Sequence, residues 1–547
     1  MSGTTSADAG TRVGDLEEAD LAYGAFTDHG PWVLDPDRLR WRRGLDRLRA
    51  KARAEVPGLV RPRMVPPGLR VVTTARQLGL AVGLWALVER RRGGRGSIAG
   101  VSRRLRIAAE RLGPTYIKLG QIISSGEGIF PAELVTEFRL CRDRVPPEPF
   151  ASVRRVVEED LGRPLEAVFA SFDTAPLAAA SIAQVHAAVL RSGETVVVKV
   201  QRGKVARLVR KDLRVMAWIA PHLVGRIPVA ALANPPALVE LFAETIAEEL
   251  DFRLEAENML DLARTFATLG QRGYVVPRPH PELVTRRVLV MERLDGFAFD
   301  DVAGMRDADV DTRAVIRTAM VGLMEGAMIH GIFHGDLHGG NLFVRPDGRT
   351  ALLDFGITGR LSEGRRLAFL RFLLAGTVND VMGQLAGLRD LGALPPDTDL
   401  AAVVADLGLD RPPVDPTTMT GDELVSEIQR TVKALLGYGA RMPKELMLFV
   451  KNMVFIDGAI ATLAPDLDIL AEIGEVVTYF ATTHGERLAA QVGVDLDDWE
   501  LDMTGFKASF GLDQATEALT YKELQERRRL ISNRLQARGG HRRRRPR

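Results

Sequence analysis

The feature that most constrains this chain of 547 residues is a short segment in its second half that is predicted to form a β-hairpin. Two apolar runs, Leu342–Arg345 and Thr350–Leu353, flank the sequence PDGR, and Asp-Gly between apolar runs is a strong turn signal. Asn341 precedes the first run and Asp354 follows the second. Because the open ends of an antiparallel hairpin meet, we expect these two side chains to be neighbours. Their oxygen atoms suit Mg²⁺, which usually shares its ligands with substrate phosphates.

The residues on either side of this hairpin indicate phosphoryl-transfer chemistry. The sequence HGDLH at 334–338 comes just before it, with Asp336 five residues before Asn341, and DFG at 354–356 comes directly after it. An aspartate near the acceptor hydroxyl, followed by an asparagine and an aspartate on the metal ions, is typical of protein-kinase catalytic loops. Either short motif alone is a weak signal, but their combination in this order is highly specific. We expect the two histidines to orient the loop by hydrogen bonding rather than to bind metal.

A lysine upstream has the position expected for binding nucleotide phosphates. His186–Leu190 and Thr195–Gln201 flank the sequence RSGE and are predicted to form a second hairpin. Three alternating valines of the second strand, TVVVKVQ, share one face, and Lys199 projects from the other. A lysine in such a strand is costly unless its amine meets an anion. Lys199 is therefore expected to bind the α- and β-phosphates of ATP.

A lysine in this role needs a carboxylate on a following helix. The segment Leu238–Leu262 has apolar residues every three or four positions and is predicted to be one helix. Asp251 and Glu255 are four residues apart and would lie on one face of that helix. We expect one acid of this helix to pair with Lys199.

Two further segments complete the expected nucleotide site. Arg287–Leu294 is predicted to be the strand that leads to an interlobe hinge, where backbone groups from Glu292 to Leu294 would meet adenine. The loop expected to cover the phosphates lacks the usual glycines, and alanine neither adopts positive φ as readily nor allows as close an approach of the backbone. The residues at this loop are Ala178, Ala179, Ala180, Ser181, Ile182 and Ala183.

Three of these motifs resemble the ABC1/UbiB (AarF) family of atypical kinases. The sequence AAASIAQVH at 178–186 is similar to the family's alanine-rich loop, KLGQ at 118–121 matches its KxGQ motif, and ELD at 249–251 matches its ExD motif. The resemblance is strong over residues 100–375 and looser near Met442–Asp468. It departs from the family pattern at SSGEGIFP, directly after KxGQ.

The resemblance implies an α+β, two-lobed protein-kinase-like fold, with a mainly helical C-lobe and an N-terminal helical extension that carries KxGQ over the active site. It also implies Mg-ATP binding and a link to isoprenoid quinone or lipid metabolism. By the match, Lys118 and Gln121 are inhibitory or substrate-side residues with Glu249 and Asp251 as partners, and Glu255 pairs with the strand lysine. The sequence leaves open whether Glu249 and Glu255 exchange these roles.

Three functions remain open on the sequence alone. In the leading interpretation, an ATPase or phosphotransferase, Mg²⁺ binds Asp354 and Asn341. Lys199 would orient the phosphates, and Asp336 would position water or a hydroxyl for in-line attack. A non-catalytic nucleotide-binding regulator is the second, although every catalytic position is filled. The third is a small-molecule phosphotransferase of the aminoglycoside or choline kinase type, enzymes that also use HGDLHxxN.

Composition limits the partners. Lys and Arg number 73 against 71 for Asp and Glu, so the net charge of +2 predicts no nucleic-acid partner. The single cysteine, Cys141, excludes an internal disulfide and suits a reducing compartment. The polar, acidic first 20 residues do not resemble a secretory signal, so we expect a cytoplasmic protein. The oligomeric state is left open.

Two features predict peripheral contact with the inner face of the membrane. The apolar run Gln77–Val88 is shorter than the roughly 20 residues that span a bilayer, so a buried or interfacial helix is expected. From Lys522 to the last residue, eleven Lys and Arg stand against two Glu. This tail would meet nucleic acid or anionic lipid, or remain solvated. By the resemblance, a hydrophobic isoprenoid, quinone-like or lipid molecule is the expected partner, which favours lipid over nucleic acid.

Changes of character along the chain predict five parts. They are a variable lead-in (1–60), a helical KxGQ extension (61–150), a kinase-like N-lobe (151–300), a helical C-lobe with the catalytic loop (301–500) and a basic C-terminal tail (501–547).

Overall fold

The computed structural model describes residues 25–61, 64–90, 94–124, 131–140, 146–223, 235–410, 437–493 and 501–537, together with isolated positions between 416 and 435. The chain divides into two compact units. Unit 1 comprises Met1–Gly296, Asn341–Arg345 and Arg349–Ile357, and unit 2 comprises Phe297–Gly340, Pro346–Gly348 and Thr358–Arg547. The acidic N-terminus, Cys141, most of the SSGEGIFP segment and the last ten residues lie outside the described residues. The five predicted parts remain predictions.

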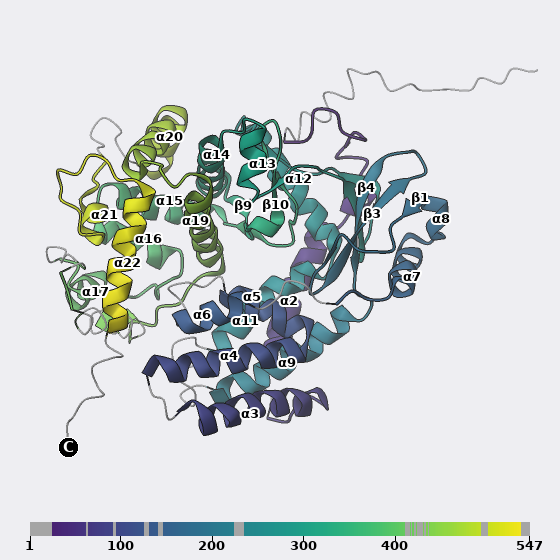
Figure 1. Ribbon diagram of the computed structural model, residues 1–547, viewed down its shortest axis with the longest axis horizontal. Helices are drawn as coiled ribbons and strands as arrows, with labels where there is room; N and C mark the ends of the chain where they lie inside the picture. The colour runs from purple at the N-terminus through teal and green to yellow at the C-terminus, as the bar shows by residue number, and fades with distance from the viewer. Residues whose placement is uncertain are drawn as a thin grey trace, which may run out of the picture. The chain divides into compact units, whose positions relative to one another are not determined.

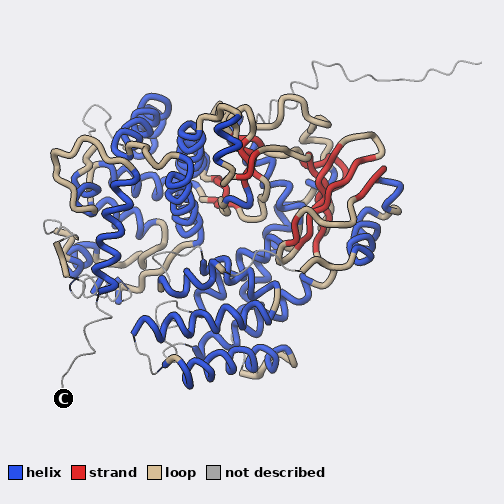
Figure 2. Tube along the Cα trace, viewed as in Figure 1, coloured by secondary structure: helices blue, strands red, loops and turns tan. Residues whose placement is uncertain are grey.

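The larger sheet of unit 1 has six antiparallel strands in the order β1-β3-β4-β7-β6, with β2 paired to β3 (Figure 2). The strands are β1 (Phe169–Phe172), β2 (Ala178–Ala179), β3 (Ala183–Leu190), β4 (Thr195–Gln201), β6 (Pro279–Val284) and β7 (Val288–Glu292). The first predicted hairpin is confirmed, because β3 and β4 pair from Val189 opposite Thr195 to Ala183 opposite Gln201.

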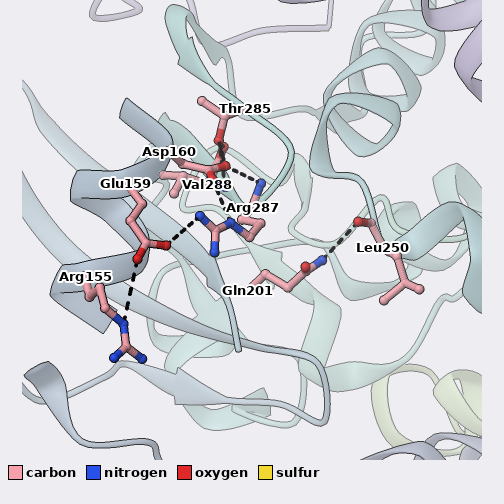
Figure 3. Close-up of polar contacts among 8 residues, drawn as sticks. All are labelled: Arg155, Glu159, Asp160, Gln201, Leu250, Thr285, Arg287 and Val288. Atoms are coloured by element: carbon pink, nitrogen blue, oxygen red, sulfur yellow. Dashed lines mark hydrogen bonds and ion pairs between the residues drawn. The ribbon is translucent and has the colours of Figure 1, made fainter. Parts of the chain in front are cut away.

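The two faces of β4 have different neighbours, as its alternation predicts. Val196, Val198 and Val200 are buried in an apolar core with residues of α7 (Phe150–Leu161) and α8 (Leu165–Val168). The end of α7 also fixes the turn between β6 and β7. Figure 3 shows Asp160 accepting hydrogen bonds from the Thr285 hydroxyl (2.6 Å) and from Arg287 Nε (2.7 Å).

The predicted single helix over 238–262 is wrong, because the chain forms two helices there, α11 (Pro235–Glu249) and α12 (Phe252–Thr268). Asp251 has extended backbone angles and its side chain accepts a hydrogen bond from the Arg253 amide, so it caps α12. Aspartate favours this N-cap position over a helix interior. Gln201 at the end of β4 donates to the Leu250 carbonyl (3.2 Å), which holds the break against the sheet (Figure 3).

The remaining helices of unit 1 lie mostly in its N-terminal part, where α3, α4 and α9 run side by side (Figure 1). They are η1 (Arg40–Arg42), α2 (Leu45–Val60), α3 (Arg70–Val88), α4 (Gly94–Leu112), α5 (Pro114–Ser124), α6 (Ala132–Arg139) and α9 (Val205–Leu223). Two described helices, Arg70–Val88 and Lys444–Leu463, are long and apolar enough to cross a membrane by length and composition, contrary to the expectation that the apolar run 77–88 is too short. The apolar run 77–88 is the second half of α3, whose 19 residues extend about 28 Å.

The second predicted hairpin is also confirmed. Strand β10 (Leu342–Val344) pairs antiparallel with β11 (Thr350–Leu352), which lies parallel to β5 (Tyr274–Val275). Gly348 in the turn has a φ of 80°, which a β-carbon would strain. At the open end, the Leu353 amide donates to the Asn341 carbonyl (2.9 Å). The residues that flank the hairpin are therefore adjacent.

Unit 2 is mainly helical. Its elements are β8 (Phe297–Ala298), α13 (Val302–Asp307), α14 (Thr312–Glu325), η3 (Gly326–His330), β9 (Ile332–His334), β12 (Thr358–Arg360), α15 (Glu363–Thr377), α16 (Val381–Asp390), α17 (Leu400–Leu407), α19 (Lys444–Leu463), α20 (Ile469–Val492), α21 (Thr504–Ser509) and α22 (Tyr521–Ala537), and η4 (Gly339–Asn341) begins in unit 2 and ends on Asn341 of unit 1. Helix α19 contributes to the apolar core of unit 2, where its Phe449 packs edge-on against Phe333 and Phe369. The basic stretch that begins at Lys522 starts within helix α22, which is anchored by buried Tyr521 and Leu524.

Candidate functional site

Lys199 lies on the face of β4 opposite the valine core and contacts two acids. Its Nζ donates to Glu255 Oε1 on α12 (2.6 Å) and lies 3.2 Å from Asp354 Oδ1. The ring of Phe252 lies 5.6 Å from the same nitrogen. The side chains of Lys199 and Glu255 are buried, whereas that of Asp354 is 41% exposed. Asp354 is therefore the acid of this trio that a ligand can reach.

The charges of these three groups are strongly coupled. Burial alone would lower the pKa of Lys199, but Asp354 and Glu255 outweigh it and raise that pKa above its usual value. Burial raises the pKa of Glu255 to about 7, against the opposing effect of Lys199. Burial also acts to raise the pKa of Asp354, but Lys199 and then Lys118 hold it well below its ordinary range. Asp354 is accordingly a carboxylate at any physiological pH.

A second lysine lies near this trio. Lys118 on α5 forms an ion pair with Glu249 at the end of α11 (3.1 Å). A β-carbon built on Gly356 would lie 3.5 Å from Glu249 Cγ, so this pair borders the DFG turn. The alternative left open by the sequence is thereby decided in this structure: Glu255 faces Lys199 and Glu249 faces Lys118.

The other two residues of the KxGQ and ExD motifs lie differently. Asp251 was expected to partner Lys118 or Gln121, but its carboxylate binds Arg253 of its own helix (2.8 Å and 2.9 Å). This follows from its N-cap position, which brings the carboxylate close to the first turn of α12. Gln121 follows Lys118 by one helical turn on α5, and its carbonyl accepts from the Ser124 hydroxyl.

The DFG turn is fastened to α12. The Gly356 amide donates to Asp354 Oδ1 (2.9 Å), and the Phe355 amide donates to Glu255 Oε1 (3.4 Å). Asn258, one turn further along α12, donates through Nδ2 to the Phe355 carbonyl (2.9 Å). One helix therefore carries the partner of Lys199 and also sets the backbone of the turn that presents Asp354.

The chemistry of this site fits a divalent cation. Asn341, nearly buried, and Asp354 supply oxygen donors at the adjacent open ends of the hairpin. Lys118 pairs with Glu249 and Lys199 with Glu255, and Asp354 beside them is the partly exposed acid that a cation can reach. Among the described residues, His, Cys, Asp and Glu form no group of three or more that could enclose a metal. A cation with few protein ligands that also binds phosphate, as Mg²⁺ usually does, suits this donor set.

The alanine-rich loop is fixed by backbone contacts rather than by glycines. The Ala180 amide donates to the Ala183 carbonyl (2.9 Å), and Arg202 donates to the carbonyls of Ala180 and Ile182. All six positions from Ala178 to Ala183 are described, and each has negative φ. Ser181 is buried. The loop thus keeps a conformation that alanine adopts without strain.

At the predicted hinge, Glu292 ends β7 and its side chain is tied to the N-terminal segment. Thr27 donates to Glu292 Oε1, and the Arg278 amide donates to Oε2 (3.1 Å). The Glu292 amide itself donates to the Arg278 carbonyl (2.9 Å). Leu294 is buried with Val275. Adenine contact in this region stays a prediction.

Asp336 lies in unit 2, and its contacts with α19 were not predicted from the sequence. Lys451 on α19 donates to Asp336 Oδ1. The two histidines orient the loop: His334 Nδ1 accepts from the Asp336 amide (3.2 Å), and His338 Nδ1 accepts from the Gly340 amide (3.1 Å). The weak similarity noted near residues 442–468 was the only signal in the sequence for the α19 contact.

Comparison with known proteins identifies the family. Residues 140–385 match the model of the ABC1 atypical kinase-like domain. An uncharacterized protein of Mycobacterium tuberculosis is 37% identical over 376 residues, which cover 68% of this chain and 76% of the relative. An uncharacterized aarF domain-containing protein kinase of Arabidopsis thaliana, chloroplastic, is 34% identical over 393 residues (67% and 73%). A probable protein kinase UbiB of Marinobacter nauticus is 32% identical over 371 residues (67% of each chain). This chain, with its kinase-like domain of mixed helices and antiparallel sheets, therefore belongs to the ABC1/UbiB family of atypical kinases.

Proposed function

We propose that this protein binds Mg-ATP and either hydrolyses it or transfers its γ-phosphoryl group. The observation that carries the proposal is the buried Lys199–Glu255 ion pair (2.6 Å) with the ionised, partly exposed Asp354 beside it (3.2 Å). A lysine paired with a helix carboxylate next to a DFG aspartate is the arrangement that kinases use on nucleotide phosphates.

Each residue has a distinct part in the proposed reaction. Lys199 orients the α- and β-phosphates, and Asp354 with Asn341 would hold Mg²⁺. When bound, that ion neutralises the charge that develops on the phosphates. Asp336 accepts the proton of a water or hydroxyl whose oxygen attacks the γ-phosphorus, and the bond to ADP breaks. The products are ADP and either inorganic phosphate or a phosphorylated acceptor.

The helices before the kinase-like core have a proposed role on the acceptor side. The ion pair between Lys118 on α5 and Glu249 (3.1 Å) supports the interpretation that the KxGQ segment covers the nucleotide residues of unit 1. Gln121 would act with Lys118 there. By family resemblance, the acceptor side serves isoprenoid quinone or lipid metabolism, and the protein would act in the cytoplasm at the inner membrane face.

The test is the variant Asp354→Asn, which removes one oxygen anion and keeps the shape of the side chain. We expect Mg²⁺-dependent ATP turnover, measured as kcat/KM, to fall about 100-fold or more, because a metal ligand acts on the transition state. Asp347→Asn, in the exposed turn of the same hairpin, is the matched control and should behave as wild type.

The outcomes separate the possible functions. Unchanged Mg-ATP affinity and turnover in Asp354→Asn would rule out the metal assignment. A wild-type protein that binds Mg-ATP by calorimetry but releases no ADP would instead be a nucleotide-binding regulator.

A further inference from the structure

The catalytic loop of unit 2 is held by two consecutive residues of α19. Lys451 Nζ donates to Asp336 Oδ1, and Asn452 contacts the backbone on both sides of that aspartate. Asn452 Oδ1 accepts from the Leu337 amide (3.0 Å), while its Nδ2 donates to the His334 carbonyl. Both Lys451 and Asn452 therefore contact loop residues that lie 115 positions earlier in the sequence.

The position of Lys451 is costly for a purely structural residue. Its side chain is 16% exposed and stands in the apolar sequence KELMLFVKNMVF, whose neighbours Leu448 and Phe449 are core residues. An ammonium group removed from water gains little net stability from one ion pair, and apolar replacements are often equally stable. A lysine at this point is better explained by what it does to the carboxylate of Asp336.

Asn452 has an equally specific position. It is fully buried and uses its amide as both donor and acceptor, whereas an ionised Asp has no donor and Leu has neither group. Its two bonds fix the backbone at residues 334 and 337, so Asp336 can change its direction little between them. The backbone and the carboxylate of the loop are therefore oriented by separate side chains of the same helical turn.

We infer that Lys451 and Asn452, which share one turn of α19, are positioning residues for Asp336. The Lys451 ammonium group fixes the rotation of the Asp336 carboxylate, which takes the proton from the attacking water or hydroxyl. The Asn452 amide fixes the loop that carries Asp336. Orientation of this kind acts on the chemical step, because a general base must lie within hydrogen-bond reach of the proton it removes. The inference rests on the proposed function.

The experiment compares Lys451→Met, which keeps the length of the side chain and removes its charge, with Lys451→Arg. We expect Lys451→Met to lower kcat for ADP release about 10- to 100-fold, while the KM for ATP stays within about twofold of wild type. Lys451→Arg keeps a donor cation and should restore most of kcat. Lys444→Met, at the first turn of the same helix, is the control and should leave both constants unchanged.

A second variant covers the backbone contacts. Asn452→Asp keeps the acceptor for Leu337 but loses the donor to His334, and should lower kcat with Mg-ATP affinity by calorimetry preserved. Preserved affinity also shows that the variant is folded.

Each outcome has a different meaning. If wild type turns over ATP and Lys451→Met keeps full kcat, the inference is overturned and the proposed function stands. If kcat falls equally in Lys451→Met and Lys451→Arg, or if KM rises in proportion, the role of Lys451 is structural and the inference fails. A wild type that neither binds nor hydrolyses Mg-ATP overturns the proposed function and this inference together.

Discussion

Glu255 pairs with Lys199, and its protonation state sets the charge of this pair. Burial raises the pKa of Glu255 to about 7, whereas the ordinary value is 4.5. Between these two pH values the folded protein keeps a proton on this carboxyl that the unfolded chain has released. The stability that this protonation contributes is complete below the unfolded pKa and is lost as pH rises through the folded value. Asp354 and Lys199 keep their charges across the same interval, because their pKa values are displaced away from it.

We therefore expect wild type to lose stability relative to Glu255→Gln as pH rises from about 4.5 to about 7, with little further change above that. The amide of glutamine does not titrate, so the difference in unfolding free energy between the two proteins should follow the ionisation of Glu255. Urea denaturation at several pH values measures it. A pH-independent difference would show that Glu255 is ionised throughout and that its pKa is not raised.

The sequence predicted where the main residues of the site lie, but not which side chains contact them. Strand alternation placed Lys199 opposite the valines, and the Asp-Gly turn brought Asn341 next to the DFG segment. The choice between Glu249 and Glu255 depended on where a helix ends, and apolar spacing alone does not reveal a cap at Asp251. Lys451 has no local pattern that points to Asp336.

Helix α12 contacts both Lys199 and the DFG turn, and no sequence pattern predicts the second contact. It carries Glu255, and its Asn258 holds the Phe355 carbonyl. Two arginines of the N-terminal segment brace the same helix: Arg42 on η1 binds Glu257 through bonds of 2.9–3.2 Å, and Arg49 on α2 donates to Asn258. These partners are more than 200 positions apart in sequence, so only the fold reveals them.

This brace predicts that Arg42→Ala weakens both stability and nucleotide binding. The bidentate pair is partly buried, so we expect a loss of about 1 kcal/mol in unfolding free energy and a few-fold weaker Mg-ATP binding. Thermal unfolding with and without Mg-ATP measures the two effects. Arg38→Ala, which removes an exposed arginine of the same segment, is the control.

The double variant Arg42→Glu with Glu257→Arg tests the pair itself. Restored binding would show that the ion pair orients α12. If Arg42→Ala matches Arg38→Ala in both measurements, the N-terminal segment does not support the site.

Over the whole molecule, charge and apolar surface are unevenly distributed despite a net charge of only +2. Helix α3 in unit 1 exposes a series of large apolar side chains, namely Leu69 before its first residue, Val72, Leu80, Leu84, Leu87 and Val88. Lys211 and Arg214 on the adjacent α9 are exposed and line a pocket with the residues that precede α3. Apolar side chains beside cations are typical of a helix that lies at an anionic lipid surface.

We expect the protein to bind anionic liposomes more strongly than neutral ones, and to be released by high salt. Each Lys or Arg near the surface contributes about 1 kcal/mol, and salt screens that contribution. Flotation at low and high salt measures it. Leu80→Ser with Leu84→Ser should reduce binding to both lipids, whereas Lys211→Gln with Arg214→Gln should reduce only the anionic preference.

A chain ending at Ala537 keeps α22 intact and tests the remaining tail. If it floats like the full chain, the last residues have no role at the membrane. Resistance of the full chain to carbonate extraction would mean that α3 is inserted rather than surface-bound, as its length permits.

The break between α11 and α12 has a mechanical consequence. In one continuous helix, Glu249 and Glu255 would move as a single rigid body, and any tilt would disturb both lysines together. With a joint at Leu250 and Asp251, each acid belongs to its own lever. The ion pair on the strand lysine and the ion pair on the lysine of α5 therefore belong to two different helices, so a change in the direction of one helix need not change the other pair.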